Sequence, residues 1–148
     1  MDLIRRSKEL FDHLVVGIGV NASKSPMFTL EERRAILEEA AAGWDNVEIR
    51  SFDKLTVQFA EEIGAQFIIR GLRAVTDFEF ELQLALMNHR LNSRIETVFI
   101  AADPENIFVA SRSIKDVWKH GGDISAFVPA AMLRALERRR RGEPVVPQ

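Results

Sequence analysis

The stretch of sequence that decides the fold is Phe67-Ile68-Ile69-Arg70-Gly71-Leu72-Arg73-Ala74-Val75-Thr76-Asp77-Phe78-Glu79. Its apolar start predicts a buried strand that ends at Arg70. Thr76 followed by Glu79 has the spacing of a capping box, which predicts the start of a helix. Two guanidinium groups, those of Arg70 and Arg73, therefore lie at a strand-to-helix connection and suit phosphate or carboxylate oxygens. Gly71 would let a ligand approach the backbone, although two solvated arginines are the plainer interpretation.

The rest of the chain alternates strands and helices. Strands are predicted at 13–20, 47–52, 66–70 and 96–101. Helices are predicted at 2–11, 29–43, 57–63, 76–92 and 129–141, and another begins at Ser111 or Ser113 and runs to His120. Hairpin signals are absent, so the pattern predicts βαβ units and an α/β fold with a doubly wound parallel sheet. We expect one domain over residues 1–141 and a flexible tail over 142–148.

Composition narrows the class of protein. The 148 residues are 47% hydrophobic and 28% charged, as in ordinary globular proteins. A formal net charge of −2 argues against bulk attraction to nucleic acid or to an anionic membrane. The absence of cysteine excludes disulfides and thiol catalysis, and fits a reducing cytoplasm. No apolar run approaches the roughly 20 residues that a membrane span requires.

The loops after the predicted strands share an anion-binding character. Ligands of doubly wound sheets bind at the carboxyl ends of the strands. In this chain those ends are followed by lysine, arginine, glycine and small hydroxyl residues: Ser23, Lys24, Thr56, Arg70, Gly71, Arg73, Asn106 and Ser111. Such a set suits a polyphosphate ligand. Neither GxGxxG nor GxxxxGK[ST] occurs, which argues against dinucleotide dehydrogenases and P-loop enzymes.

Other polar residues have structural interpretations. We expect His13, His89 and His120 to be structural. Glu79 and Glu81 lie two apart on a helix and so point in different directions, which excludes a carboxylate pair. No His/Asp/Glu cluster has metal-ligand spacing, so a magnesium ion would arrive with a nucleotide. Apolar residues cover more than one face of the 76–92 helix, a pattern that suits packing between subunits.

Three segments carry a resemblance to bacterial phosphopantetheine adenylyltransferases. They are Lys24–Arg33, Ile69–Asn88 and Phe108–Pro129, the last containing Ser111-Arg112-Ser113-Ile114-Lys115-Asp116 and Gly121-Gly122-Asp123. The resemblance covers residues 1 to about 137. It implies a Rossmann-like nucleotidyltransferase that joins the adenylyl group of ATP to 4′-phosphopantetheine and releases pyrophosphate. It also implies Mg²⁺, a cytoplasmic homohexamer, and coenzyme A as feedback ligand.

The resemblance also assigns roles to residues. Lys24, Thr56 and Arg70 would bind phosphopantetheine, and Lys24 and Arg73 would be catalytic. The residues implied to contact ATP are Gly71, Leu72, Arg73, Glu81, Asn106, Ile107, Phe108, Val109, Ala110, Ser111 and Arg112. Where the family often has three serines, this chain has Ala110-Ser111-Arg112. Arg112 either adds a cation at the pyrophosphate or points into solvent.

The family begins upstream of the helix expected at residue 2. Its first strand and a Thr-Phe-Asp-Pro-x-Thr-x-Gly-His loop have no counterpart in this sequence. By resemblance, that strand would lie between the strands at 14–20 and 67–70, so two strand edges would be left unpaired. We therefore expect a start site assigned too late, and a genuine truncation would be catalytically impaired.

Two other functions stay open. One is a related adenylyltransferase that acts on nicotinate mononucleotide or a similar phosphate. The other is a truncated protein that binds a nucleotide or coenzyme A without catalysing transfer. A pyrophosphate-release assay would separate these hypotheses.

Overall fold

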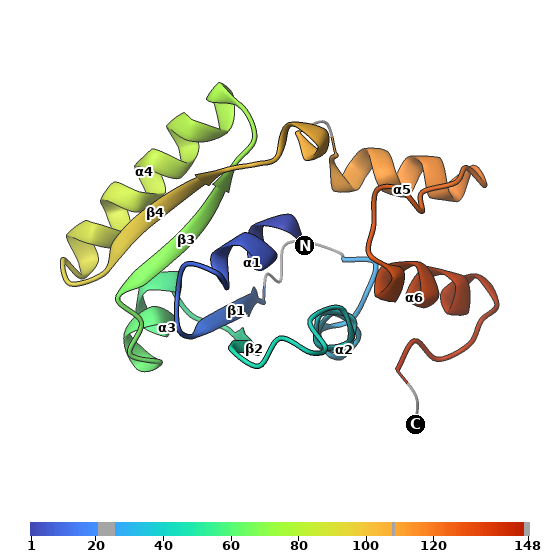
Figure 1. Cartoon of the computed structure of the whole chain (residues 1–148), viewed down its shortest axis with the longest axis horizontal. Coiled ribbons are helices and arrows are strands. Elements are labelled where there is room, and N and C mark those ends of the chain that lie inside the picture. The colour runs from blue at the N-terminus through green and yellow to red at the C-terminus, as the bar shows by residue number, and fades with distance from the viewer. Residues whose placement is uncertain (21–25, 108, 147–148) are drawn as a thin grey trace.

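The computed structural model describes residues 1–20, 26–107 and 109–146, and shows strands alternating with helices (Figure 1). The elements are α1 (Asp2–Ser7), β1 (Leu14–Gly19), α2 (Leu30–Ala40), β2 (Val47–Phe52), α3 (Thr56–Glu62), β3 (Phe67–Leu72), α4 (Val75–Leu91), β4 (Glu96–Ala101), the 3₁₀ turn η1 (Pro104–Asn106), α5 (Ser111–Lys119) and α6 (Ala130–Arg140). This confirms the predicted α/β class. None of the described helices is long and apolar enough to cross a membrane.

The four strands form two parallel ladders. β1 pairs with β2, where Leu14 lies opposite Val47, and β3 pairs with β4, where Phe67 lies opposite Glu96. Among the described residues β1 and β3 do not pair with each other. Both strands line one cavity of about 1250 Å³. The facing edges of these two strands are therefore unpaired within the described part of the chain, as the resemblance implied.

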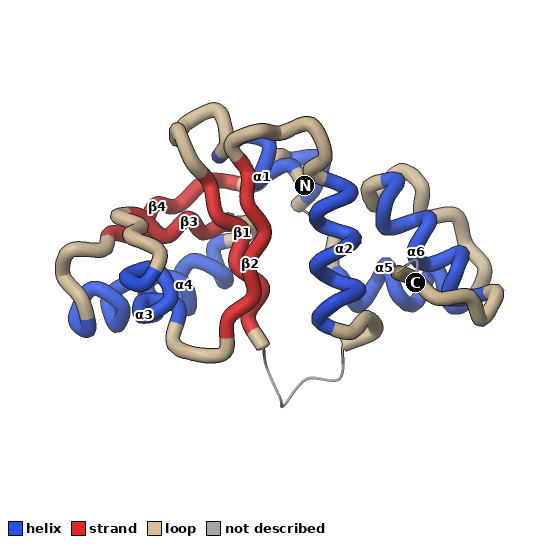
Figure 2. Tube along the Cα trace, turned by 90° about the horizontal axis from the view of Figure 1, so that it is seen from below, coloured by secondary structure: helices blue, strands red, loops and turns tan. Residues whose placement is uncertain are grey.

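Helices cover the ladders from opposite sides. α2 packs against β1 and β2, and α3 and α4 pack against β3 and β4, so that the strands stand between these helices (Figure 2). Ile18, Ala41 and Ile49 form the buried cluster on the α2 side. The other side has its own buried cluster, made of Val57, Ala60, Ile68 and Ile95.

The C-terminal helices build a third core beside the strands. It contains buried residues from the segment before α2, from α2, from the α5–α6 connection and from α6: Phe28, Ile36, Ile124, Ala131, Ala135 and Leu136. Ile114 and Trp118 of α5 pack against it. Val145, within the predicted tail, also packs against this cluster. Figure 1 shows α5 and α6 on the far side of α1 from α4.

The sequence predicted capping boxes at Thr29 and at Thr76, and only the first is present in the structure. The N-cap Thr29 accepts from the Glu32 amide at 3.2 Å, and its own amide donates to the Glu32 carboxylate at 2.8 Å, which completes a capping box. The capping box predicted at Thr76 is wrong, because α4 already begins at Val75 and Ala74 is its N-cap. Thr76 lies inside the first turn, where a residue cannot be the cap.

The first helix is shorter than the predicted 2–11. It ends at Ser7 because the next residues turn and find tertiary partners. The Asn46 side-chain amide donates to the carbonyls of Lys8 at 2.8 Å and Phe11 at 3.1 Å. These bonds replace those that a longer helix would have made.

Candidate active site

The strand that carries Arg70 continues beyond the predicted end. Leu72 pairs with Ala101, and the Ala102 amide donates to the Leu72 carbonyl at 2.7 Å. Arg70 and Gly71 therefore lie within β3, and only Arg73 and Ala74 connect β3 to α4. The prediction that the strand ends at Arg70 is wrong, since pairing with β4 extends it past the apolar run.

Arg70 is held by a carboxylate of α4. Its Nε and one terminal nitrogen donate to the two Glu81 oxygens at 2.6 and 2.7 Å, a bidentate ion pair. The side chain of Glu81 is 13% exposed and that of Arg70 is 45% exposed. Hydrogen bonding to Glu81 raises the pKa of Arg70 above its usual value. A phosphate that binds Arg70 must therefore share this guanidinium with Glu81 or displace the carboxylate.

Arg73 has a similar partner. Its Nε donates to the Asp77 carboxylate at 3.1 Å, one helical turn further along the chain. The sequence predicted neither the Arg70–Glu81 pair nor the Arg73–Asp77 pair. The four-residue spacing of Asp77 and Glu81 places both carboxylates on one side of α4, but it does not show which strand that side faces.

One cavity brings together two predicted substrate-binding residues. Thr56, the first residue of α3, and Arg70 of β3 both line the cavity of about 1250 Å³ between β1 and β3. Lys54 and Arg33 add positive charge to its lining, and Lys54 forms an ion pair with Glu62. The third predicted residue, Lys24, lies outside the described residues.

Helix α1 contacts β3 and β4 near their carboxyl ends. A Cβ atom placed on Gly71 would lie 3.2 Å from Leu3 Cδ2, tighter than most such contacts, so a side chain there would press on α1. Arg6 donates to the Ala101 carbonyl at 2.7 Å. The close neighbour of Gly71 in this structure is thus α1, a contact that the sequence did not predict.

The predicted nucleotide segment follows the carboxyl end of β4. Asp103 accepts from the Glu105 amide at 2.9 Å and starts η1, after which Ile107 is exposed and Val109 and Ala110 are half-buried. Ala110 is the N-cap of α5, and the exposed residues Ser111 and Arg112 form its first turn. Phe108 and the side chain of Asn106 lie outside the described part of the chain.

This arrangement of parallel strands, with basic residues at one edge, agrees with a family comparison. Residues 1–117 match the family model described as cytidylyltransferase-like. The fold and the match place the chain in the cytidylyltransferase-like class of nucleotidyltransferases.

Individual relatives narrow the class. The chain is 46% identical over 143 residues to a phosphopantetheine adenylyltransferase of Lachnoclostridium phytofermentans, an alignment that covers 97% of this chain and 88% of the relative. It is 50% identical over 139 residues to the protein of that name from Rhizorhabdus wittichii, covering 94% and 84%. The Caulobacter protein of the same name is 48% identical, with 92% and 86% covered. The chain belongs to the phosphopantetheine adenylyltransferase family.

Proposed function

We propose that this protein transfers the adenylyl group of ATP to 4′-phosphopantetheine, giving dephospho-coenzyme A and pyrophosphate. Family membership supports the reaction. The observation that supports particular residues is that Thr56 and Arg70 both line one cavity, with Arg73 in the connection that follows β3. Ligands of parallel α/β folds bind at this edge.

In this reaction the protein mainly has to position the two substrates and neutralise the negative charge of their phosphates. A phosphate oxygen of phosphopantetheine attacks the α-phosphorus of ATP, the bond from that phosphorus to the bridging oxygen breaks, and pyrophosphate leaves with the electron pair. Arg70 would hold the acceptor phosphate, and Arg73 would balance the charge on the ATP phosphates. Holding both reactants in line can remove about 7–11 kcal/mol of the barrier. No covalent intermediate with the protein is required.

Magnesium enters this proposal only as a companion of ATP. Over residues 1–20, 26–107 and 109–146, no three His, Asp or Glu side chains converge as a metal site. The carboxylates nearest the proposed site, Asp77 and Glu81, are each paired with an arginine. Phosphate oxygens and water would supply the ligands of Mg²⁺, which commonly keeps several waters. The proposal therefore assigns no protein side chain as a direct ligand of Mg²⁺.

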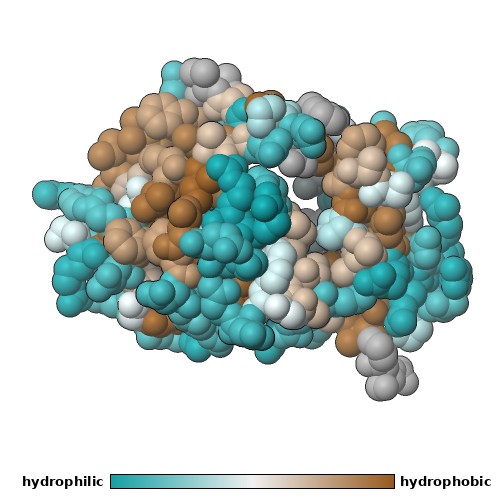
Figure 3. Space-filling view, viewed as in Figure 1, coloured by the Kyte–Doolittle hydropathy of each residue, from teal (hydrophilic) through white to brown (hydrophobic). Residues whose placement is uncertain are grey.

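A homo-oligomer is also part of the proposal, a hexamer by resemblance. Phe80, Leu84, Met87 and Leu91 recur on α4 at spacings of four, three and four residues, the pattern of a helix–helix seam. Phe80, Met87 and Leu91 are 61, 60 and 57% exposed, although their neighbour Phe78 packs edge-on to Phe99 of β4. Figure 3 shows apolar side chains gathered over this part of the surface. Covering this seam would favour assembly.

Two further expectations accompany the reaction. Coenzyme A would bind as a feedback ligand, because it shares the pantetheine arm and the adenylyl group with the product. The enzyme would work in the cytoplasm, to which its cysteine-free composition is suited.

Pyrophosphate release tests the proposal. The chain is incubated with Mg-ATP and either 4′-phosphopantetheine or nicotinate mononucleotide, and pyrophosphate is followed over time. We expect release only with phosphopantetheine, and a large loss of rate in Arg70→Ala. The matched control is Arg94→Ala, which removes an arginine that is 80% exposed and paired with Glu61 on another part of the surface. Release with nicotinate mononucleotide instead would contradict the proposed substrate.

Binding without transfer is the second candidate function. The ion pairs of Arg70 and Arg73 favour it, because both guanidinium groups proposed to act on the phosphates are already bound by carboxylates. This alternative would be established if calorimetry detected binding of phosphopantetheine and of ATP while the assay showed no release of pyrophosphate.

A further inference from the structure

One cation of the large cavity has no carboxylate partner. Arg33 of α2 lines the cavity of about 1250 Å³ together with Arg70 and Lys54. Arg70 is paired with Glu81, and Lys54 is paired with Glu62. Arg33 is half-buried, yet no carboxylate of the described residues lies within ion-pair distance of it. Because burying a charge costs free energy unless a partner offsets it, an anionic ligand in this cavity would stabilise Arg33.

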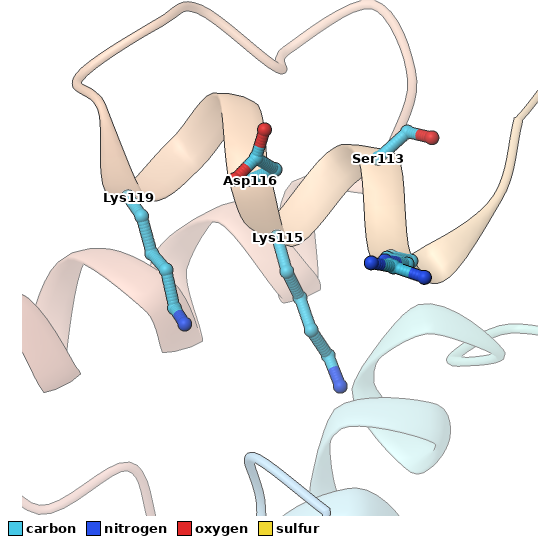
Figure 4. A pocket seen from close by; sticks show the side chains of 5 residues that line it. Ser113, Lys115, Asp116 and Lys119 are labelled. Carbon is cyan, nitrogen blue, oxygen red and sulfur yellow. The ribbon is translucent and has the colours of Figure 1, made fainter.

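The rest of the cavity lining also suits a polar ligand. The cavity is built by residues of α1, β1, α2, β2, α3 and β3, so a ligand there can contact several elements at once. Ser7 of α1 lines it as well, is only 1% exposed, and has a hydroxyl without a hydrogen-bond partner among the described residues. Buried hydroxyl groups normally have such a partner. The cavity of about 510 Å³ differs, because exposed residues of α5 alone line it, among them Lys115 and Lys119 (Figure 4).

The start of α2, which carries Arg33, is held from another side by α6. Arg139 of α6 donates to a Glu32 carboxylate oxygen at 2.6 Å, and its guanidinium lies 5.0 Å from the centre of the buried Phe28 ring. The same Glu32 oxygen accepts from the Thr29 amide at 2.8 Å. The Glu32 side chain is only 16% exposed. A largely buried network therefore joins α6 to the first turn of α2, and we call the Arg139–Glu32 pair the α6 clamp.

The α6 clamp determines the direction in which Arg33 extends. Glu32 and Arg33 are consecutive in α2, so an ion pair that fixes Glu32 also fixes the rotation of the helix about its axis. Leu30, three residues before Arg33, lies on the same side of α2 and lines the same cavity. A second pair between α6 and α2 joins Arg134 to Glu39 at 2.6 Å, but it lies at the other end of α2 and is 56 and 49% exposed. Only the first of these pairs is next to the cavity.

We propose that Arg33 binds the phosphate of the acceptor from the α2 side of the cavity, and that Arg139 is a positioning residue that acts through Glu32. The inference rests on the proposed function, since 4′-phosphopantetheine supplies the anion. A phosphate monoester carries a charge of about −1.5 to −2 at neutral pH. Glu81 already offsets the charge of Arg70, so the phosphate gains from a further cation that is unpaired. Arg33 is such a cation, and it lines the cavity that Arg70 lines.

Calorimetric titrations of the full chain with 4′-phosphopantetheine and with pantetheine test the proposal. Arg33→Met should raise the Kd for phosphopantetheine at least about fivefold and leave that for pantetheine within about twofold. Arg139→Met should raise the Kd for phosphopantetheine at least about threefold, and Arg139→Lys, which keeps the charge, should recover most of the affinity. The matched control Arg134→Met breaks the other pair between α6 and α2, and should leave both dissociation constants unchanged.

A double variant separates positioning from a purely structural role. If Arg139 acts through Arg33, adding Arg139→Met to Arg33→Met should raise the Kd little further. An Arg139→Met chain that melts at a lower temperature but binds phosphopantetheine as Arg134→Met does would overturn the positioning role. Equal losses for phosphopantetheine and pantetheine in Arg33→Met, or a loss for ATP alone, would overturn the contact with the acceptor phosphate. No binding of phosphopantetheine by the unaltered chain would overturn the proposed function, and this site with it.

Discussion

At the scale of single residues, the central feature is the competition for Arg70. Its guanidinium donates to both Glu81 oxygens, and 45% of the Arg70 side chain is still exposed to solvent. The Glu81 carboxylate is only 13% exposed, so breaking the pair would leave a mostly buried charge without a partner. A doubly charged phosphate should therefore share Arg70 with Glu81 more readily than displace it. The pair keeps Arg70 in place before a substrate arrives.

Replacing the competitor should strengthen phosphate binding. In Glu81→Gln the side chain keeps its shape and loses its charge, so the Kd for phosphopantetheine without ATP should fall by up to about fivefold, the equivalent of roughly 1 kcal/mol. Calorimetry measures this change. Glu61→Gln, which releases Arg94 instead, is the control and should have no effect. Weaker binding in Glu81→Gln would show that the carboxylate positions Arg70 and does not compete with the ligand.

At the scale of elements, the sequence predicted one of two capping boxes correctly and missed the features that depend on distant segments. The α2 capping box could be predicted because Thr29 and Glu32 are three residues apart and need nothing else. The end of β3 could not, because its last two residues are held by β4. The end of α1 was likewise decided by Asn46, far away in the sequence. The ends of β3 and α1 both depend on hydrogen bonds between distant segments.

The unpaired edge of β1 gives a testable pattern of amide exchange. The amides of Leu14 and Val20 donate to Asn46 and Phe52, so alternation turns those of Val15 and Gly17 away from β2 toward the cavity. We expect Val15 and Gly17 to exchange rapidly with solvent deuterium in NMR, and the paired amide of Ile18 to exchange much more slowly. Equal protection of neighbouring amides would contradict an open edge.

At the scale of the whole molecule, the sequence placed Thr56 and Arg70 at one edge of the strands, but it did not predict the ion pairs that hold the arginines. The rule that ligands bind at the carboxyl ends of parallel strands placed Thr56 and Arg70 together, and both line one cavity. Their roles stay predictions. Lys24 lies outside the described residues. The pairing of Arg70 and Arg73 with α4, and the approach of α1 to Gly71, depend on how helices dock onto strands, which spacing alone does not determine.

Assembly should depend on the exposed seam of α4. Phe80→Glu/Met87→Glu places charge on the two apolar residues that are 61 and 60% exposed, and should reduce the mass measured by light scattering to that of a smaller species. Glu79→Lys changes an exposed charge on a neighbouring face of the same helix and should preserve the assembly. An unchanged mass in the double variant would place the interface elsewhere.

The central claim is that Arg70 recognises the phosphate of the acceptor, and one calorimetric comparison tests it most directly. The unaltered chain and Arg70→Ala are each titrated with 4′-phosphopantetheine and with pantetheine, which lacks the phosphate. We predict that the unaltered chain prefers the phosphorylated ligand by at least about tenfold, or 1.4 kcal/mol, and that Arg70→Ala loses this preference. Equal affinity of the unaltered chain for the two ligands, or an undiminished preference in Arg70→Ala, would contradict the account.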